Sequence, residues 1–311
     1  MSTVVVLLSD KRSGSTMFQE ELCRHPGVQT VAYSPHTYLE THWWLMGAVL
    51  LDRPGPLFVS GSRYDGYGTP NNARAYMVDL LLRCVPDFNP PSDNRALVFK
   101  GWEALASAYA KPIFFEKSPQ FLSQWAAISL LLEWADETDF DVKIIGLVRN
   151  PHAVMYSAAE LFGSAPETRQ FAWLAGCRNL FTLKSLLPDD QFYALRYEDL
   201  VADPVGGFAR IAEFIGLDPY PACGSGVHSS STEKWKQDPD HTLLLDVAVQ
   251  QVAEKLGYTD VELMNQNGRV AATGALSRRP PAQSAKRINR LRHTLVKPLV
   301  LRLRALLKVQ G

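Results

Sequence analysis

Continuous hydrophobic runs alternate with amphipathic stretches along most of the chain. The two clearest runs, residues 3–8 and 142–148, have the length and apolar character of buried strands. Further strands are expected at residues 28–33, 114–117 and 191–196, and helices at 15–24, 72–84, 97–109, 122–135, from Pro151 onward, and at 170–186, 205–215 and 243–256. This alternation indicates an α/β fold, a three-layer sandwich in which helices flank a central parallel sheet.

The turn after the first strand has the composition of an anion-binding site. Residues 9–16 read Ser-Asp-Lys-Arg-Ser-Gly-Ser-Thr and lie between the strand and the first helix. Free backbone N–H groups and the helix dipole favour an anion at such a helix start, so we expect a bound phosphate. The turn differs from the nucleotide-hydrolysing P-loop because the first glycine and the lysine of that motif are absent. The cation lies before the glycine, at Arg12.

The charge balance divides the 311-residue chain into two parts. Residues 1–267 hold all 32 acidic residues and carry a net charge near −11, whereas residues 268–311 hold 11 basic residues and no acidic ones. We expect one folded domain over residues 1–267, with an insertion over the sheet at 45–115, followed by a basic linker and tail. Leucines recur at helical spacing within 288–309. Three roles stay open for this amphipathic tail: contact with an anionic membrane, packing on the domain, or a homodimer contact.

Cysteine spacing and the amino terminus bear on the compartment. The four cysteines are far apart, and no pattern of His and Cys spacing predicts a metal or disulfide framework. The chain enters a strand by residue 4 and has no window of eighteen apolar residues. We therefore expect a cytoplasmic protein with reduced thiols, with peripheral contact to a membrane as the alternative, and no nucleic-acid partner.

Four segments occur in the order and spacing found in one enzyme family. In chain order they are Arg12-Ser-Gly-Ser-Thr16, Glu116-Lys-Ser-Pro-Gln-Phe-Leu122, Leu147-Val-Arg-Asn-Pro-His-Ala-Val-Met-Tyr-Ser157 and Leu195-Arg-Tyr-Glu-Asp-Leu-Val-Ala-Asp-Pro204. Together they resemble the sulfotransferases that use the donor PAPS (3′-phosphoadenosine 5′-phosphosulfate), in motif form the carbohydrate-acting and bacterial members. The resemblance implies a P-loop-like sulfotransferase fold, PAPS as co-substrate, PAP as product, and no metal.

The resemblance assigns donor-binding roles to two of these segments and to one loop. It implies that Arg12, Ser13, Gly14, Ser15 and Thr16 hold the 5′-phosphate. Arg149 and Ser157 then match the family's ligands of the 3′-phosphate, with Asn150 standing where the family usually has Asp. Residues 229–236 resemble the loop that closes over the adenosine 3′-phosphate, which makes Lys234 and Trp235 candidates for donor binding.

The resemblance also points to a general base. Glu40-Thr-His-Trp-Trp44 is similar to a Glu-x-His-Phe-Phe motif whose glutamate acts as the base, so Glu40 is the first candidate and His42 its hydrogen-bonding neighbour. His36 is the rival base. Lys117 matches a lysine that lines the family's active site and, with Arg12, would offset charge on the departing phosphate. For each of these residues a purely structural role stays open, as a loop carboxylate, a packed histidine or a surface lysine.

The resulting hypothesis is in-line transfer of a sulfuryl group from PAPS to a hydroxyl or amine, with Glu40 removing the acceptor proton. The acceptor stays open between a glycan, a glycolipid and a small metabolite. Two alternatives are a small-molecule kinase with a degenerate P-loop and a non-catalytic nucleotide-binding protein.

Overall fold

The computed structural model describes residues 2–36, 38–53, 68–228 and 232–272. The expected linker at 271–285 falls almost entirely outside them, and the amphipathic tail at 288–309 entirely so. Two compact units are present: the first contains residues up to 148 and residues 176–227, and the second contains residues 149–175 and the described residues after 227. Within the described residues, no helix is both long enough and apolar enough to cross a membrane.

A five-stranded parallel sheet forms the centre of the first unit, as the alternating pattern predicts. Its strand order is β2-β3-β1-β4-β5, and the strands are β1 (Thr3–Ser9), β2 (Val28–Gln29), β3 (Ile113–Lys117), β4 (Asp141–Val148) and β5 (Phe192–Arg196). β1 pairs with β3 on one side and β4 on the other, so Leu7 lies opposite both Lys117 and Ile145. This register brings Lys117 to the same edge of the sheet as the turn that follows β1.

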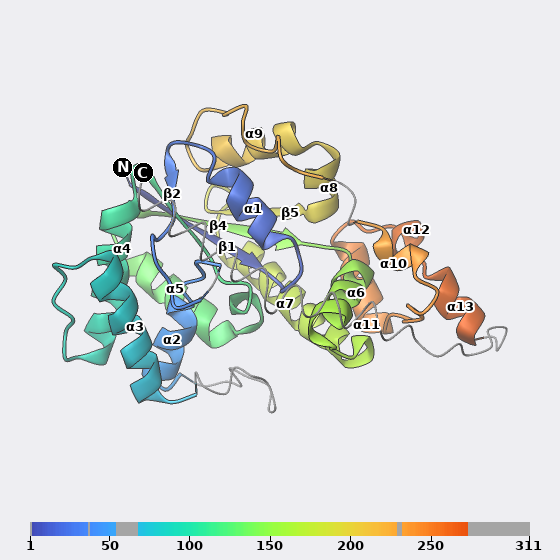
Figure 1. The fold of residues 1–311 in the computed structure, drawn as a ribbon, viewed down its shortest axis with the longest axis horizontal. Helices are drawn as coiled ribbons and strands as arrows, with labels where there is room; N and C mark the ends of the chain where they lie inside the picture. Colours follow the sequence, from blue (N-terminus) through green and yellow to red (C-terminus); the bar gives the residue numbers. More distant parts are fainter. Residues whose placement is uncertain (1, 37, 54–67, 229–231, 273–311) are drawn as a thin grey trace. The chain divides into compact units, whose positions relative to one another are not determined.

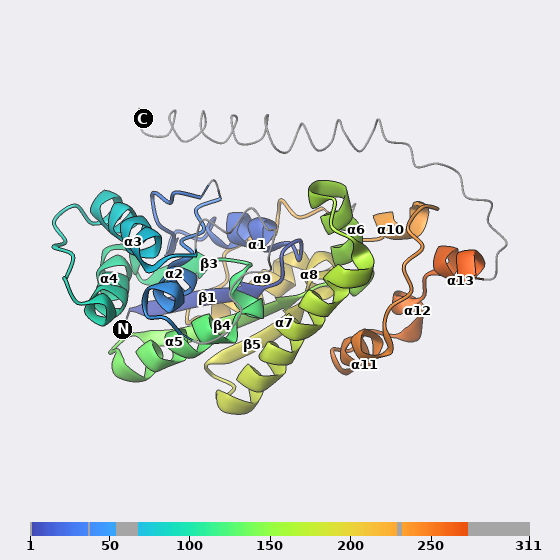
Figure 2. The same ribbon diagram turned by 90° about the horizontal axis from the view of Figure 1, so that it is seen from below.

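Helices cover both faces of this sheet. The helices of the first unit include α1 (Ser15–Leu22), α2 (Trp43–Leu50), α3 (Pro70–Cys84), α4 (Asn94–Tyr109), α5 (Trp125–Glu137), α8 (Tyr197–Ala202) and α9 (Pro204–Phe214). Helices α1 and α9 lie on one face (Figure 1). There Phe18 of α1 and Phe208 of α9 pack in a core cluster with Phe115 of β3. On the other face, α2 packs against α3, α4 and α5 (Figure 2). Trp102 of α4 packs there on Phe114.

The second unit is helical in its described residues. It contains α6 (Pro151–Phe162), α10 (Lys234–Gln237), α11 (Val247–Lys255), α12 (Asp260–Leu263), α13 (Gln266–Ala272) and the first part of α7 (Pro166–Leu186), whose later residues belong to the first unit. Asn150 caps α6 by accepting a hydrogen bond from His152 N at 2.9 Å, and Pro151 occupies the first turn, where proline is tolerated.

Several expected boundaries are wrong. The helix expected at 243–256 begins only at Val247, because the Asp246 side chain caps it by accepting from Ala248 N. The strand expected at 28–33 is reduced to Val28–Gln29. Helix α2 was not expected, since all eight of its residues are buried and its sequence therefore has no polar face.

Candidate active site

The turn between β1 and α1 has the backbone geometry of an anion cradle. Gly14 precedes the first residue of α1 and has φ 94°, a left-handed conformation that favours glycine. No side chain in the described part of the chain caps this helix, and its first turn contains no acidic residue, so the helix start is arranged to accept an anion. The hydroxyl of Ser13 is buried and has no hydrogen-bond partner among the described residues. Such a donor fits a phosphate oxygen.

Arg12 and Thr16 complete this turn. Arg12 has φ 75°, an uncommon conformation for a residue with a side chain, and backbone strain of this kind often occurs at ligand sites. Thr16 lies in the first turn of α1, and its Oγ1 is 3.4 Å from Lys117 Nζ. The turn is therefore connected to the end of β3 through Lys117.

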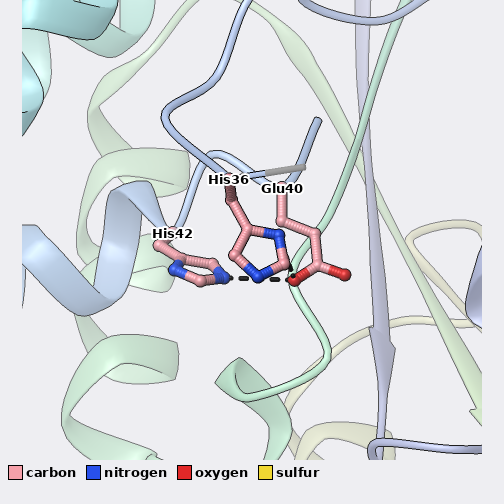
Figure 3. Close-up of side chains that lie close together, drawn as sticks. All are labelled: His36, Glu40 and His42. Carbon is pink, nitrogen blue, oxygen red and sulfur yellow. Dashed lines mark hydrogen bonds and ion pairs between the residues drawn. The ribbon is translucent and has the colours of Figure 1, made fainter. Parts of the chain in front are cut away.

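Glu40 lies at the centre of a buried polar cluster. It is only 5% exposed, and its Oε1 accepts a hydrogen bond from Lys117 Nζ at 2.8 Å. Its Oε2 lies 3.2 Å from both His42 Nε2 and His36 Nδ1 (Figure 3). Glu40 thus contacts His42, its expected hydrogen-bonding neighbour, and also His36, the rival base.

The cluster perturbs the titration of its members. Burial would raise the pKa of Glu40, but the hydrogen bond from His42 and the charge of Lys117 outweigh it and lower that pKa to about 2. Burial is also the main reason why the pKa of His36 is lowered to about 4, and its attraction to Glu40 only partly opposes this effect. At neutral pH the site therefore holds an ionised carboxylate beside a neutral His36.

The end of β3 holds the segment that carries Glu40 and His42. Glu116 is 2% exposed and accepts from Thr41 Oγ1 at 2.8 Å and from the Ser118 hydroxyl. Ser118 Oγ in turn accepts from His42 N at 3.0 Å. Burial raises the pKa of Glu116. These hydrogen bonds were not predicted, although Glu116 and Ser118 flank Lys117 in the motif and could have been found as its immediate neighbours.

Tyr76 of α3 is a further residue that the sequence analysis did not single out. Its ring is parallel to that of His42, with an interplanar angle of 6° and 6.4 Å between centroids, and its hydroxyl lies 3.5 Å from the Glu40 carbonyl oxygen. A residue from the 45–115 segment therefore lies directly beside the candidate base.

The remaining candidates belong to the second unit. Arg149 is 6% exposed, and its carbonyl oxygen accepts from Trp173 Nε1 at 3.1 Å. Ser157 lies on α6 and is half-buried. Trp235 of α10 is buried and stacks on His152 of α6, with ring centroids 4.4 Å apart, while Lys234 beside it is exposed. The packing of Trp235 brings α10 to the helix that carries Ser157.

Comparison with known proteins decides the family. Residues 5–221 match the sequence profile described as the sulfotransferase family. The chain belongs to the sulfotransferase family. Its fold and this match support sulfuryl transfer as the general class of reaction, which disfavours the kinase alternative. No curated protein matched the sequence.

Solved sulfotransferase structures share this fold. One is the sulfotransferase domain of the Synechococcus PCC 7002 olefin synthase, with a TM-score of 0.58 and 23% identity, the match covering 83% of this chain and 97% of that domain. Another is the sulfotransferase domain from the curacin biosynthetic pathway, with a TM-score of 0.55 and 19% identity, covering 83% of this chain and 99% of that domain. The α/β sulfotransferase fold expected from the motifs is thereby confirmed.

Proposed function

We propose that this sulfotransferase transfers a sulfuryl group from PAPS to an acceptor hydroxyl, with Glu40 as the general base. The observation that carries the proposal is the position of Lys117, whose ammonium lies 2.8 Å from Glu40 Oε1 and 3.4 Å from Thr16 Oγ1. One cation thus connects the candidate base with the turn suited to the donor's 5′-phosphate.

The residues of the turn fit a phosphate group. The uncapped start of α1 and the unpaired buried hydroxyl of Ser13 offer hydrogen-bond donors, and Arg12 supplies positive charge. In this proposal residues 12–16 hold the 5′-phosphate, while Arg149 and Ser157, together with Lys234 and Trp235, serve the 3′-phosphate end. PAPS, when bound, supplies an activated sulfuryl group for transfer to the acceptor.

Glu40 is suited to accept the acceptor's proton. Its carboxylate is ionised at neutral pH, and His42 orients Oε2 through the 3.2 Å contact. A carboxylate with a pKa near 2 is a weak base, and Lys117 is one cause of that low value. When the Lys117 ammonium moves toward a phosphate held by the turn, Glu40 loses this interaction and its proton affinity rises. Lys117 would thus couple donor binding to activation of the base.

The 45–115 segment forms the acceptor side in this proposal. Its helix α3 places Tyr76 beside His42, so an acceptor that reaches Glu40 would pass close to this ring. An aromatic ring in that position suits stacking on a sugar or another flat apolar face.

The test is a transfer assay with radiolabelled PAPS over a panel of glycan, glycolipid and small hydroxyl-bearing acceptors. We expect Glu40→Gln to lose at least ~100-fold in turnover, as expected for a missing general base, and to keep the thermal stabilisation by PAP. His36→Gln is the matched variant and should lose much less. Native turnover of Glu40→Gln would refute Glu40 as the base, and loss confined to His36→Gln would assign that role to His36. ATP is the control ligand, for which no thermal stabilisation is expected.

A further inference from the structure

Three potential metal ligands converge beside the phosphate turn. They belong to His36, Glu40 and His42, and one ligand atom from each lies within 4.8 Å of the other two. Figure 3 shows the two imidazole rings lying beside the same carboxylate oxygen, with a contact drawn from each ring to it. Two imidazoles and one carboxylate form a ligand set that binds zinc in proteins.

Two of the distances between the ligand atoms agree with tetrahedral coordination of an ion. Zinc bonds of 2.0–2.1 Å place neighbouring ligands about 3.3 Å apart. Glu40 Oε2 lies 3.2 Å from His36 Nδ1 and 3.2 Å from His42 Nε2, so two edges of the tetrahedron already have this length. The third distance, between the ligand nitrogens of the two histidines, is at most 4.8 Å. It would have to shorten by at most about 1.5 Å for both nitrogens to bind one ion. The His36 side chain is 25% exposed and has room to make this adjustment.

A second observation concerns the buried nitrogen of His36. His36 Nδ1 is buried and close to Glu40, yet it lacks the geometry of a hydrogen bond to any described residue. A buried polar atom without a hydrogen bond is uncommon and often marks an absent water or ion. Lys117 occupies Oε1 of Glu40, which leaves Oε2 facing the two imidazoles. One cation between the two rings would therefore be within reach of His36 Nδ1 and of this oxygen.

We propose that His36, Glu40 and His42 bind a zinc-class divalent ion, and that the bound ion reversibly inhibits sulfuryl transfer. Metal binding is independent of the reaction, whereas inhibition rests on the proposed function of Glu40 as the base. An ion on Oε2 would occupy the lone pair that takes the acceptor proton. With three protein ligands, a fourth position stays open for water or an anion.

The donor set and the local charge define which ion binds and how tightly. Two nitrogen ligands favour Zn²⁺ over Mg²⁺, which prefers oxygen ligands and keeps its waters. The ammonium of Lys117, 2.8 Å from the same carboxylate, repels any cation placed there. We therefore expect moderate affinity in the native chain and tighter zinc binding by Lys117→Met.

The first experiment measures metal binding alone. The full chain is titrated with Zn²⁺ against a chromophoric zinc indicator, and Mg²⁺ serves as the control ion. We expect one equivalent of zinc in the native protein, binding at least tenfold weaker in His36→Ala and in Glu40→Gln, and tighter binding in Lys117→Met. His228→Ala is the matched control, because His228 is exposed and lies outside the cluster. Circular dichroism verifies the fold of each variant.

Equal zinc affinity in native, His36→Ala and Glu40→Gln proteins would overturn the site, as would the absence of stoichiometric binding.

The second experiment adds zinc to the transfer assay and then a chelator. We expect inhibition that the chelator reverses, and at least tenfold more zinc for the same inhibition of His36→Ala. Zinc that binds as expected but leaves transfer unchanged would refute the inhibition and the role of Glu40 as base, while the metal site would stand.

Discussion

At the scale of single residues, Gly14 connects the phosphate turn to the core of the first unit. Its φ of 94° is strained for any residue with a side chain, and an added Cβ would overlap the ring of Tyr197. We expect Gly14→Ala to displace the turn and to lose most of its affinity for PAP. The measurement is the shift in melting temperature with increasing PAP.

Gly216 provides the matched control for this substitution. It has φ 79°, but an added Cβ would meet no atom within 4 Å. Gly216→Ala should therefore cost only the backbone strain, about 1–2 kcal/mol, and leave PAP affinity unchanged. Equal loss of PAP affinity in both variants would show that general destabilisation, and not the geometry of the turn, explains the effect of Gly14→Ala.

Lys117 lowers the proton affinity of Glu40, in addition to the hydrogen bond from His42. The ammonium is 1% exposed and is one of the charges that hold the pKa of Glu40 near 2. Lys117→Met removes this charge, and burial then acts with less opposition, so we expect the pKa of Glu40 to rise. A ¹³C NMR titration of labelled glutamate side chains measures it, and the double variant Lys117→Met/Glu40→Gln identifies the resonance. An unchanged pKa would contradict the coupling between Lys117 and the base.

At the scale of elements, the end of β3 supports the segment before α2 through Thr41. The Thr41 hydroxyl donates to Glu116 at 2.8 Å and accepts from Trp43 N at 3.2 Å. Thr41→Val keeps the shape of the side chain but leaves buried polar groups without partners, so we expect a loss of about 1–3 kcal/mol in the free energy of unfolding. Chemical denaturation measures this loss.

Thr182→Val is the matched control for Thr41→Val. The Thr182 residue is exposed and its hydroxyl donates to the Arg178 carbonyl of its own helix, so loss of the hydroxyl should change stability by less than about 0.5 kcal/mol. Similar losses in both variants would argue against a special role for the contact between Thr41 and Glu116.

The hydrophobic pattern of the chain predicted some strands and helices better than others. β1 and β4 were predictable because the middle of a parallel sheet requires uninterrupted apolar runs. The end of α6 was not delimited in advance, although Pro151 marked its start. α2 was missed for a physical reason: buried on all sides, it has no polar face to reveal a helical period.

Motif resemblance predicted the residues of the candidate site, but it did not predict the contacts among them. Glu40, His36, His42 and Lys117 were each predicted, but nothing in their spacing shows that all four meet. Their meeting depends on the register of β3 beside β1 and on the left-handed conformation of His42 at the start of α2. Both are properties of the folded chain. Roles for these residues stay predictions until the variants are measured.

At the scale of the whole molecule, each compact unit contains a histidine whose pKa is lowered by burial. In the first unit this is His36, and in the second it is His152, whose pKa burial lowers to about 3. His152 Nε2 lies 3.0 Å from the Leu263 carbonyl oxygen and must donate to it, so Nδ1 accepts from His241 Nε2 at 3.3 Å. A proton on Nδ1 would remove this acceptor.

These histidines predict how stability depends on pH. A histidine with a lowered folded pKa is protonated in the unfolded chain below about pH 6.5 while it is still neutral in the folded chain. The unfolded state then binds more protons, so the free energy of unfolding falls as pH decreases from about 6.5 toward the folded values of about 4 and 3. Above pH 6.5 both contributions to stability are fully present.

The His152→Gln variant tests this linkage. The glutamine amide can still donate to the Leu263 carbonyl but does not titrate, so the variant should lose less stability between pH 6 and pH 4 than the native chain. The expected difference in slope is about one proton, or about 1.4 kcal/mol per pH unit. Urea denaturation at a series of pH values measures it, and His228→Gln, which replaces an exposed histidine, should keep the native slope. If His152→Gln also keeps that slope, then His152 is not the buried group that destabilises the fold on acidification.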